Sequence, residues 1–192
     1  WLFADEFRAR YPKVSVLDGA ILTEENRIYT SGGANSYWSL LLHLVEKYTN
    51  REMAILASKY FAIDIDRDSQ TSFMIFKGQK SHKDNEMLLV QNYIEAHVDE
   101  KMSVDKLAAL VSLGRRSFER RFKIATNNTV LEYIQRVKIE SAKRQYEASQ
   151  QNISEVMFNV GYTDSKAFRS TFKKITGLTP AAYRSRYNKL PM

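Results

Sequence analysis

The chain of 192 residues contains no cysteine, only three histidines and no long apolar run. The lack of cysteine excludes disulfides and thiolate metal sites, and it is typical of a reducing compartment. His43, His82 and His97 do not cluster, which argues against a histidine metal site. No run of 18 apolar residues is present, which argues against a transmembrane helix. We therefore expect a cytoplasmic protein with no metal, cofactor or membrane contact.

Positive charge is concentrated in the second half of the chain. Residues 1–81 hold 10 Lys/Arg and 10 Asp/Glu, whereas residues 82–192 hold 19 and 12 and account for the net charge of +7. Between Arg115 and Lys189 the counts are 16 and 6. Charge alone is better interpreted as a solvated surface. It indicates nucleic acid only if the basic residues lie on an element that can enter a groove.

Helix and turn signals divide the chain near residue 80. Before that point they predict helices over about 2–11, 34–48 and 51–63, with short strands at 14–17 and 27–30. After it they predict helices over about 84–98, 103–111, 115–126, 129–148, 152–160 and 164–176, and a last one from 180. We expect a mainly α protein, with a helical domain over 81–192 preceded by a partial α/β segment over 1–80.

A shift of 50 residues aligns the second half of the chain with itself. Of the 19 pairs from 118/168 to 136/186, 7 are identical, where composition alone would give about one. The identical pairs are Phe118/Phe168, Phe122/Phe172, Lys123/Lys173, Thr126/Thr176, Thr129/Thr179, Tyr133/Tyr183 and Arg136/Arg186. Asn127 and Gly177, two residue types that tolerate a left-handed helix cap, also coincide.

Each copy of the repeat predicts a helix with one buried and one basic face. Phenylalanines at i and i+4 lie on the same side of a helix, and the basic residues between them point elsewhere. A shorter helix and a tight turn precede each copy, which is the order of a helix-turn-helix. The Phe-x-x-x-Phe-Lys pattern is by itself ordinary core packing. Two copies with basic outer faces favour double-stranded DNA, with the helix over 129–148 setting a separation of about 34–36 Å.

The outer faces of the two repeated helices supply the candidate DNA contacts. The predicted base contacts are Arg116, Glu119, Arg120, Lys166 and Arg169. The predicted phosphate contacts are Arg115, Lys123, Lys138, Ser165 and Lys173, with the helix ends near Ser103 and Asn152. Arginine reads guanine with two hydrogen bonds. Glu119 is expected either to accept from cytosine or to hold Arg116 or Arg120 in place.

Several ordered segments carry a family signature. They are residues 117–123 (SFERRFK), 133–138 (YIQRVK), 161–164 (GYTD), 168–174 (FRSTFKK) and 177–184 (GLTPAAYR). On these segments, residues 84–192 resemble the DNA-binding domain of AraC/XylS-type transcription regulators. The resemblance implies seven helices, two helix-turn-helix units and a long linking helix. Ser170 stands where the family pattern F-x-R-x-F-K has arginine, with Arg169 beside it.

A second set of segments lies in residues 1–80. They are residues 1–7 (WLFADEF), 10–12 (RYP), 28–33 (IYTSGG) and 41–46 (LLHLVE). They are similar to the end of an amidotransferase-like (PfpI-type) sensor domain, which precedes the DNA-binding domain in one branch of the family. The resemblance implies a small-molecule effector or a homodimer contact through residues 1–80. Because the chain starts without Met at what would be mid-domain, we interpret it as truncated.

The alternative is an amidase- or peptidase-like enzyme domain fused to a basic helical module. Ser31 precedes Gly32-Gly33 at a strand–turn–helix junction, but the G-x-S-x-G elbow is lacking. Gly32-Gly33 at the start of a helix is open to anion binding by its backbone amides, but two glycines are better interpreted as a tight turn. His43 is interpreted as a core or interface residue, and no Ser/His/Asp order or carboxylate pair stands out. We therefore predict no catalytic residue and a sequence-specific transcription regulator.

Overall fold

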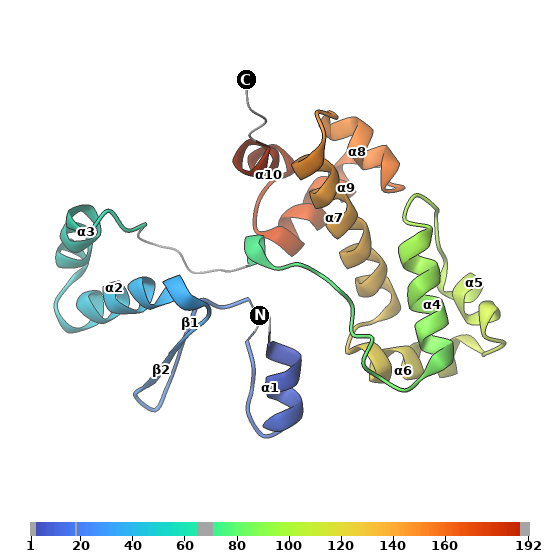
Figure 1. The fold of residues 1–192 in the computed structure, drawn as a ribbon, viewed down its shortest axis with the longest axis horizontal. Coiled ribbons are helices and arrows are strands. Elements are labelled where there is room, and N and C mark those ends of the chain that lie inside the picture. Colours follow the sequence, from blue (N-terminus) through green and yellow to red (C-terminus); the bar gives the residue numbers. More distant parts are fainter. Residues whose placement is uncertain (1–2, 18, 65–70, 189–192) are drawn as a thin grey trace. The chain divides into compact units, whose positions relative to one another are not determined.

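The computed structural model describes residues 3–17, 19–64 and 71–188 (Figure 1). The chain divides into two compact units, Trp1–Met74 and Ile75–Met192. The sequence predicted a boundary a few residues later, after residue 80. Residues 75–80 contact the second unit, where the ring of Phe76 lies edge-on to that of Tyr133 with centroids 5.2 Å apart.

The first unit combines helices with a two-stranded hairpin. Its elements are α1 (Ala4–Arg10), β1 (Leu22–Glu25), β2 (Ile28–Ser31), η1 (Ala34–Ser36), α2 (Tyr37–Tyr48), α3 (Arg51–Tyr60) and η2 (Thr71–Phe73). The strands are antiparallel, with Leu22 opposite Ser31. Asn26 and Arg27 both have positive φ, which is the backbone of a two-residue hairpin turn. The predicted strand at 14–17 is therefore wrong, because β1 begins five residues after it and pairs with β2 through this turn.

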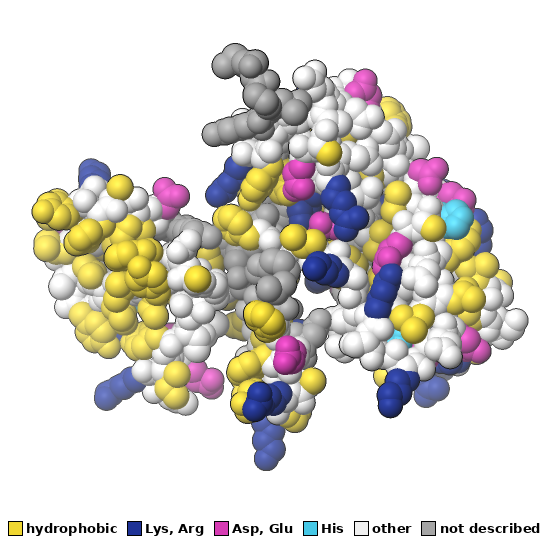
Figure 2. Space-filling view, viewed as in Figure 1, with side chains coloured by type: hydrophobic (Ala, Val, Ile, Leu, Met, Phe, Trp, Pro, Cys, Tyr) yellow, Lys and Arg dark blue, Asp and Glu magenta, His cyan; other side chains and the backbone are white. Residues whose placement is uncertain are grey.

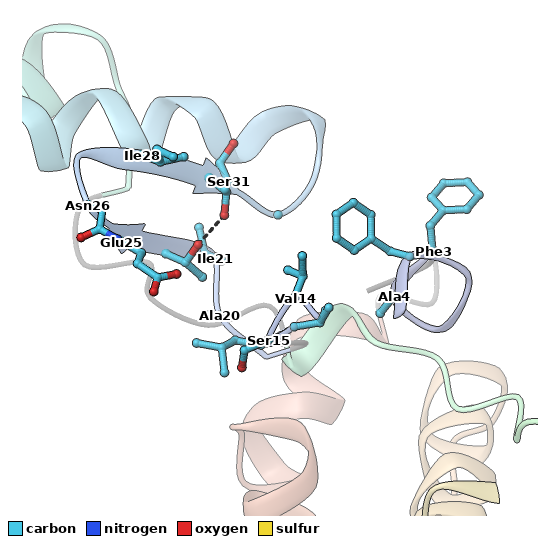
Figure 3. Close-up of a pocket in the computed structure, with 16 residues that line it drawn as sticks. Phe3, Ala4, Val14, Ser15, Ala20, Ile21, Glu25, Asn26, Ile28 and Ser31 are labelled. Atoms are coloured by element: carbon cyan, nitrogen blue, oxygen red, sulfur yellow. Dashed lines mark hydrogen bonds between the residues drawn. The ribbon is translucent and has the colours of Figure 1, made fainter. Parts of the chain in front are cut away.

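An apolar hollow of about 670 Å³ opens in the first unit (Figure 3). Side chains from α1 and its N-cap Phe3, from residues 14–17 and from the hairpin line it, including Val14 and Ile28. A hydrogen bond of 2.8 Å from the amide of Gly32 to the carbonyl of Ile21 closes the hairpin beside it. The hairpin thus supplies one part of the lining of the hollow, and α1 and residues 14–17 supply the rest.

The helices α2 and α3 carry large hydrophobic side chains on their surface (Figure 2). The exposed residues include Tyr37, Trp38, Leu41, Met53, Leu56, Tyr60 and the C-cap residue of α3, Phe61. Asn50 separates the two helices and caps α3 by accepting a hydrogen bond of 2.9 Å from the amide of Met53. We refer to this set of seven side chains as the α2–α3 apolar surface.

The second unit has seven helices between Ile75 and Asn188, as the sequence predicted. They are α4 (Asn85–Ala96), α5 (Val104–Leu110), α6 (Arg115–Thr126), α7 (Val130–Ala148), α8 (Ile153–Asn159), α9 (Ser165–Thr176) and α10 (Pro180–Tyr187). The caps account for most of the boundaries. Capping boxes are formed at Thr129 and Asn152, where Glu132 and Glu155 accept hydrogen bonds from the cap backbone.

Two hydrophobic cores lie along α7, a helix of 19 residues that is about 28 Å long at 1.5 Å per residue. Tyr133 and Val137 pack with α4, α5 and α6, whereas Ile139 and Tyr146 pack with α8, α9 and α10. We call these the first and second subdomains, and Figure 1 shows α7 running from one to the other. The long helix therefore positions both helix-turn-helix pairs, α5–α6 and α8–α9.

The predicted repeat is present in three dimensions. Phe118 and Phe122 are fully buried with ring centroids 5.7 Å apart, and Phe168 and Phe172 are buried at 5.8 Å. The ring of Phe122 meets that of Tyr133 edge-on at 5.3 Å. The matching pair in the second subdomain is edge-on at 5.5 Å. The identical residues of the two copies thus form the same aromatic cluster twice.

The ends of α6 and α9 repeat in the same detail. Thr126 donates to the carbonyl of Phe122 (2.8 Å) and accepts from the amide of Asn128 (3.2 Å). Thr176 makes the matching bonds at 2.8 and 3.1 Å. The next residues, Asn127 and Gly177, have φ of 55° and 76°, the left-handed cap that the sequence predicted. Both helices therefore end in the same way and direct the chain into the following helix.

Candidate nucleic-acid interface

The outer face of α6 is polar and basic. Phe118 and Phe122 are buried, so the residues on the opposite side of α6 face solvent. Those residues are Arg116, Glu119, Arg120 and Lys123, all exposed. Gly114 caps the helix without a side-chain hydrogen bond, so no side chain satisfies its first amide donors. The structure therefore brings the predicted contact residues of this helix onto one accessible surface.

Arg115 and Glu119 form an exposed ion pair on this face. The Nε of Arg115 lies 3.5 Å from Oε1 of Glu119, and its Nη1 lies 3.3 Å from Oδ2 of Asp105. The sequence left two roles open for Glu119, accepting a hydrogen bond from cytosine or holding Arg116 or Arg120 in place. The structure pairs it instead with Arg115, four residues earlier on the helix. Such an exposed pair is weak, and it leaves both side chains available to another partner.

Arg121 points away from this surface and joins α6 to the start of α4. Its Nε lies 2.6 Å from Oδ2 of Asp84 and its Nη2 lies 2.9 Å from Oδ1, and a further hydrogen bond reaches Glu86. This guanidinium holds the pKa of Asp84 below its usual value. Asp84 also caps α4 by accepting from the amide of Met87. Sequence reasoning missed this role, although the Asp84 cap could have suggested it.

The outer face of α9 is also basic. The exposed residues are Ser165, Lys166, Arg169, Ser170, Lys173 and Lys174. Within residues 75–188, no carboxylate lies within ion-pair distance of Lys166, Arg169 or Lys173. Asp164 caps the helix by accepting from the amides of Lys166 (2.7 Å) and Ala167 (3.1 Å). The amide donors are therefore engaged at α9, whereas the cap of α6 leaves them open.

Lys138 is the exception among the predicted contacts. Its side chain is buried, with 6% exposed, and burial lowers its pKa. The Nζ donates to the carbonyls of Val98 (2.6 Å), Glu100 (3.0 Å) and Val160 (2.8 Å). An ammonium group has three donors, and all three are used here. This corrects the predicted phosphate contact, because the group is turned into the protein.

The residues of the enzyme hypothesis lie in the first unit. Ser31 is exposed at the end of β2, and the Nε2 of His43 lies 3.6 Å from Oε2 of Glu24 on the neighbouring strand. Gly33 has φ of 104°, and the hydroxyl of Ser36 donates to the carbonyl of Gly32 at 2.6 Å. These contacts close the tight turn that the glycines predicted.

The described residues hold no group of three or more His, Asp or Glu side chains that could bind a metal ion. None of the described helices is long and apolar enough to cross a membrane.

The sequence matches the family described as a helix-turn-helix domain over residues 107–186. The MmsAB operon regulatory protein of Pseudomonas aeruginosa is 35% identical over 94 residues, which are 49% of this chain and 31% of that protein. The HTH-type transcriptional regulator ArgR of the same organism is 23% identical over 186 residues, covering 96% of this chain and 56% of the regulator. The chain thus spans from a third to little more than half of these relatives.

A solved structure of similar fold is the DNA-binding domain of the global transcriptional factor AdpA in complex with a target DNA. Its sequence is 31% identical and the TM-score is 0.52. The match covers 53% of this chain and 92% of that domain. That share of the chain is somewhat shorter than the second unit, in which both helix-turn-helix pairs lie.

Proposed function

Since the chain belongs to the AraC/XylS family of helix-turn-helix transcription regulators, we propose that it binds double-stranded DNA with α6 and α9 in two successive segments of the major groove. One observation carries this proposal. The two helices bury identical phenylalanine pairs and turn basic residues outward, on a fold shared with a domain solved on DNA. The first helix of each pair, α5 or α8, would cross behind.

The proposed contacts fall into two groups, those that recognise base edges and those that hold the protein on the phosphate backbone. Arg116 and Arg120, with Glu119, would reach base edges in the first groove segment, and Lys166 and Arg169 would do so in the second. Phosphate contacts would come from Arg115, Lys123, Ser165 and Lys173. Their exposure supports this assignment, and the open amide donors at the start of α6 favour an anion there.

The experiment that tests this function is a mobility shift after selection of bound sites from a random duplex library. Wild-type protein should enrich a motif with two conserved blocks. Arg120→Ala should weaken binding to the enriched duplex. Lys13→Ala, which removes the same charge from an exposed position of the first unit, should leave it unchanged. Equal loss in both variants would mean that net charge alone drives binding. No enrichment by the wild type would refute the proposal.

For the first unit we propose the end of an amidotransferase-like sensor domain. The similarity to ArgR covers 96% of this chain, so it extends well into the first unit. The apolar hollow would take a small apolar effector, and the α2–α3 apolar surface would join two copies. Leu41→Glu with Leu56→Glu should lower the sedimentation coefficient of a homodimer to that of a monomer. Ile124→Glu, at an exposed position of the second unit, should not.

The enzyme alternative makes a different prediction for the same chain. An amidase or peptidase would release ammonia from glutamine or cleave a peptide, and Ser31→Ala would abolish that activity. We expect no hydrolysis above buffer by the wild type and no difference between it and Ser31→Ala. Activity that depends on Ser31 would establish the alternative.

A further inference from the structure

The two subdomains meet at the middle of α7, where Lys138 separates their cores. Val137 belongs to the first core and Ile139 to the second, and the charged side chain between them is buried. Burying an ammonium group is costly unless hydrogen bonds compensate it. The groups that accept hydrogen bonds from this ammonium therefore indicate the structural role of Lys138.

The compensation comes from both subdomains at once. The carbonyls of Val98 and Glu100 follow the end of α4 in the first subdomain, at 2.6 and 3.0 Å from Nζ. The third acceptor is the carbonyl of Val160, the C-cap residue of α8 in the second subdomain, at 2.8 Å from Nζ. Carbonyls at helix C-termini lack partners within the helix and attract a cation. One ammonium group thus connects two segments that are otherwise about sixty residues apart in sequence.

A glycine is needed at the same place. Gly161 has φ of 70°, a conformation that side chains disfavour. A Cβ on this residue would lie 2.4 Å from the carbonyl oxygen of Asp99 and 2.5 Å from Nζ of Lys138. The backbones of the two subdomains therefore approach as closely as a residue without a side chain permits. The ring of Tyr162 flanks the ammonium, with its centroid 5.9 Å from Nζ.

We propose that Lys138, with Gly161, is a positioning residue that fixes the relative orientation of α6 and α9 and so selects the spacing of the two DNA segments. The role in selecting DNA spacing rests on the proposed function. The role in fixing the orientation of α6 and α9 is a property of the protein without DNA. Each subdomain has its own core, so without this connection α7 and local contacts alone would hold the angle between the two helices. The inference gives a buried lysine a role in recognition without any contact to DNA.

The first measurement needs no DNA. The sequence contains no cysteine, so spin labels can be placed at Ile124→Cys and Lys174→Cys, exposed positions that are equivalent in the two copies. Pulsed electron paramagnetic resonance should give one narrow distribution of the distance between the two labels when Lys138 is present. Lys138→Met, which keeps an unbranched side chain one atom shorter and removes the three donors, should broaden the distribution or shift its mean. An unchanged distribution in Lys138→Met would overturn the proposal.

The second measurement uses the selected duplex with one base pair inserted or deleted between its two blocks, which rotates one block by about 35°. Wild type should lose affinity at both altered spacings. Lys138→Met should lose most of this preference while keeping the salt dependence of binding. Lys123→Met, an exposed lysine of α6, should do the reverse and lower the salt slope by about 0.9. A reduced salt slope with intact spacing preference in Lys138→Met would restore the phosphate contact and refute positioning.

A second variant guards against loss of folding. Gly161→Ala keeps the ammonium but forces the two backbones apart, so it should shift the label distance and the preferred spacing. If Lys138→Met melts below the assay temperature, Gly161→Ala decides the matter with both readouts. If labels respond and no duplex is enriched by wild type, the orientation role stands and the proposed function falls. If wild type binds DNA and neither variant changes distance or spacing, the positioning role is refuted.

Discussion

The two subdomains of the second unit share their inner faces and differ in their outer ones. Both bury two phenylalanines and a tyrosine, and both end the second helix with a threonine followed by a left-handed cap. Outside, α6 presents Arg116, Glu119 and Arg120, where α9 presents Lys166, Arg169 and Ser170. The shared residues thus account for the fold, and the residues that differ are the ones free to distinguish two DNA segments.

The starts of the two helices differ as well. Asp164 occupies the first amides of α9, whereas Gly114 leaves those of α6 without a side-chain acceptor. An anion is favoured at open amides and disfavoured beside a carboxylate. The comparison teaches that the first subdomain is better suited to hold a phosphate at its helix end, while the second must rely on its lysines and arginine.

The largest expected effect tests the equivalence of the inner faces. Phe118→Ala and Phe168→Ala should each lower the free energy of unfolding by roughly 3–5 kcal/mol, because each removes a fully buried ring. Urea unfolding followed by circular dichroism measures this. Ile124→Ala, at a position that is 75% exposed, should stay within about 0.5 kcal/mol of wild type. A large loss for only one phenylalanine would show that the two cores are not equivalent.

Sequence reasoning predicted the repeat because buried residues are constrained twice, by helical spacing and by the partner they pack on. The positions of Phe118 and Phe168 therefore predicted the packing of each helix. They also predicted its exposed face, because the residues on the opposite side of the helix must face solvent. The same reasoning failed at Lys138, whose environment depends on Val98 and Val160, two distant carbonyls that no local pattern indicates. The strand at 14–17 failed because alternation without a partner does not define a strand; pairing across a turn does.

The next effect tests the outer faces. Arg120→Ala should cost about 1–3 kcal/mol on the selected site and relax discrimination at one base pair of the first segment. Ser170→Arg, which restores the arginine of the family pattern, should add a guanine preference in the second segment. Binding isotherms on single-base variants of the site measure both. If Arg120→Ala weakens every variant equally, this arginine contacts phosphate and its proposed role is wrong.

A smaller effect compares the two helices as phosphate contacts. Lys123 and Lys173 occupy equivalent positions in the repeat and both are exposed. Removing either by substitution with alanine should lower the slope of log affinity against log salt by about 0.9, because one condensed counterion fewer is released. Titrations at several salt concentrations measure the slope. A change for one lysine alone would show that the two helices approach the backbone differently, which would sharpen the comparison of their starts.

The smallest effect concerns an ion pair of the first subdomain, between Arg121 of α6 and Asp84 at the start of α4. Arg121 lowers the pKa of the Asp84 carboxyl in the folded protein. The pair therefore adds stability above the ordinary carboxyl pKa of about 3.9, and this contribution is lost as the pH falls through the lowered value. Since both side chains are partly exposed, the contribution is expected to be smaller than each effect above.

Melting temperatures of wild type and Arg121→Met should differ slightly at pH 7 and converge at a pH low enough to protonate Asp84. Arg169→Met on α9 is the matched control, because no carboxylate of residues 75–188 lies within ion-pair distance of it. Its difference from wild type should not change with pH over the same range. A difference in melting temperature between wild type and Arg121→Met that persists at low pH would show that Arg121 joins α6 to α4 by packing of its aliphatic stem. The charge of Arg121 would then not contribute to the stability of the first subdomain.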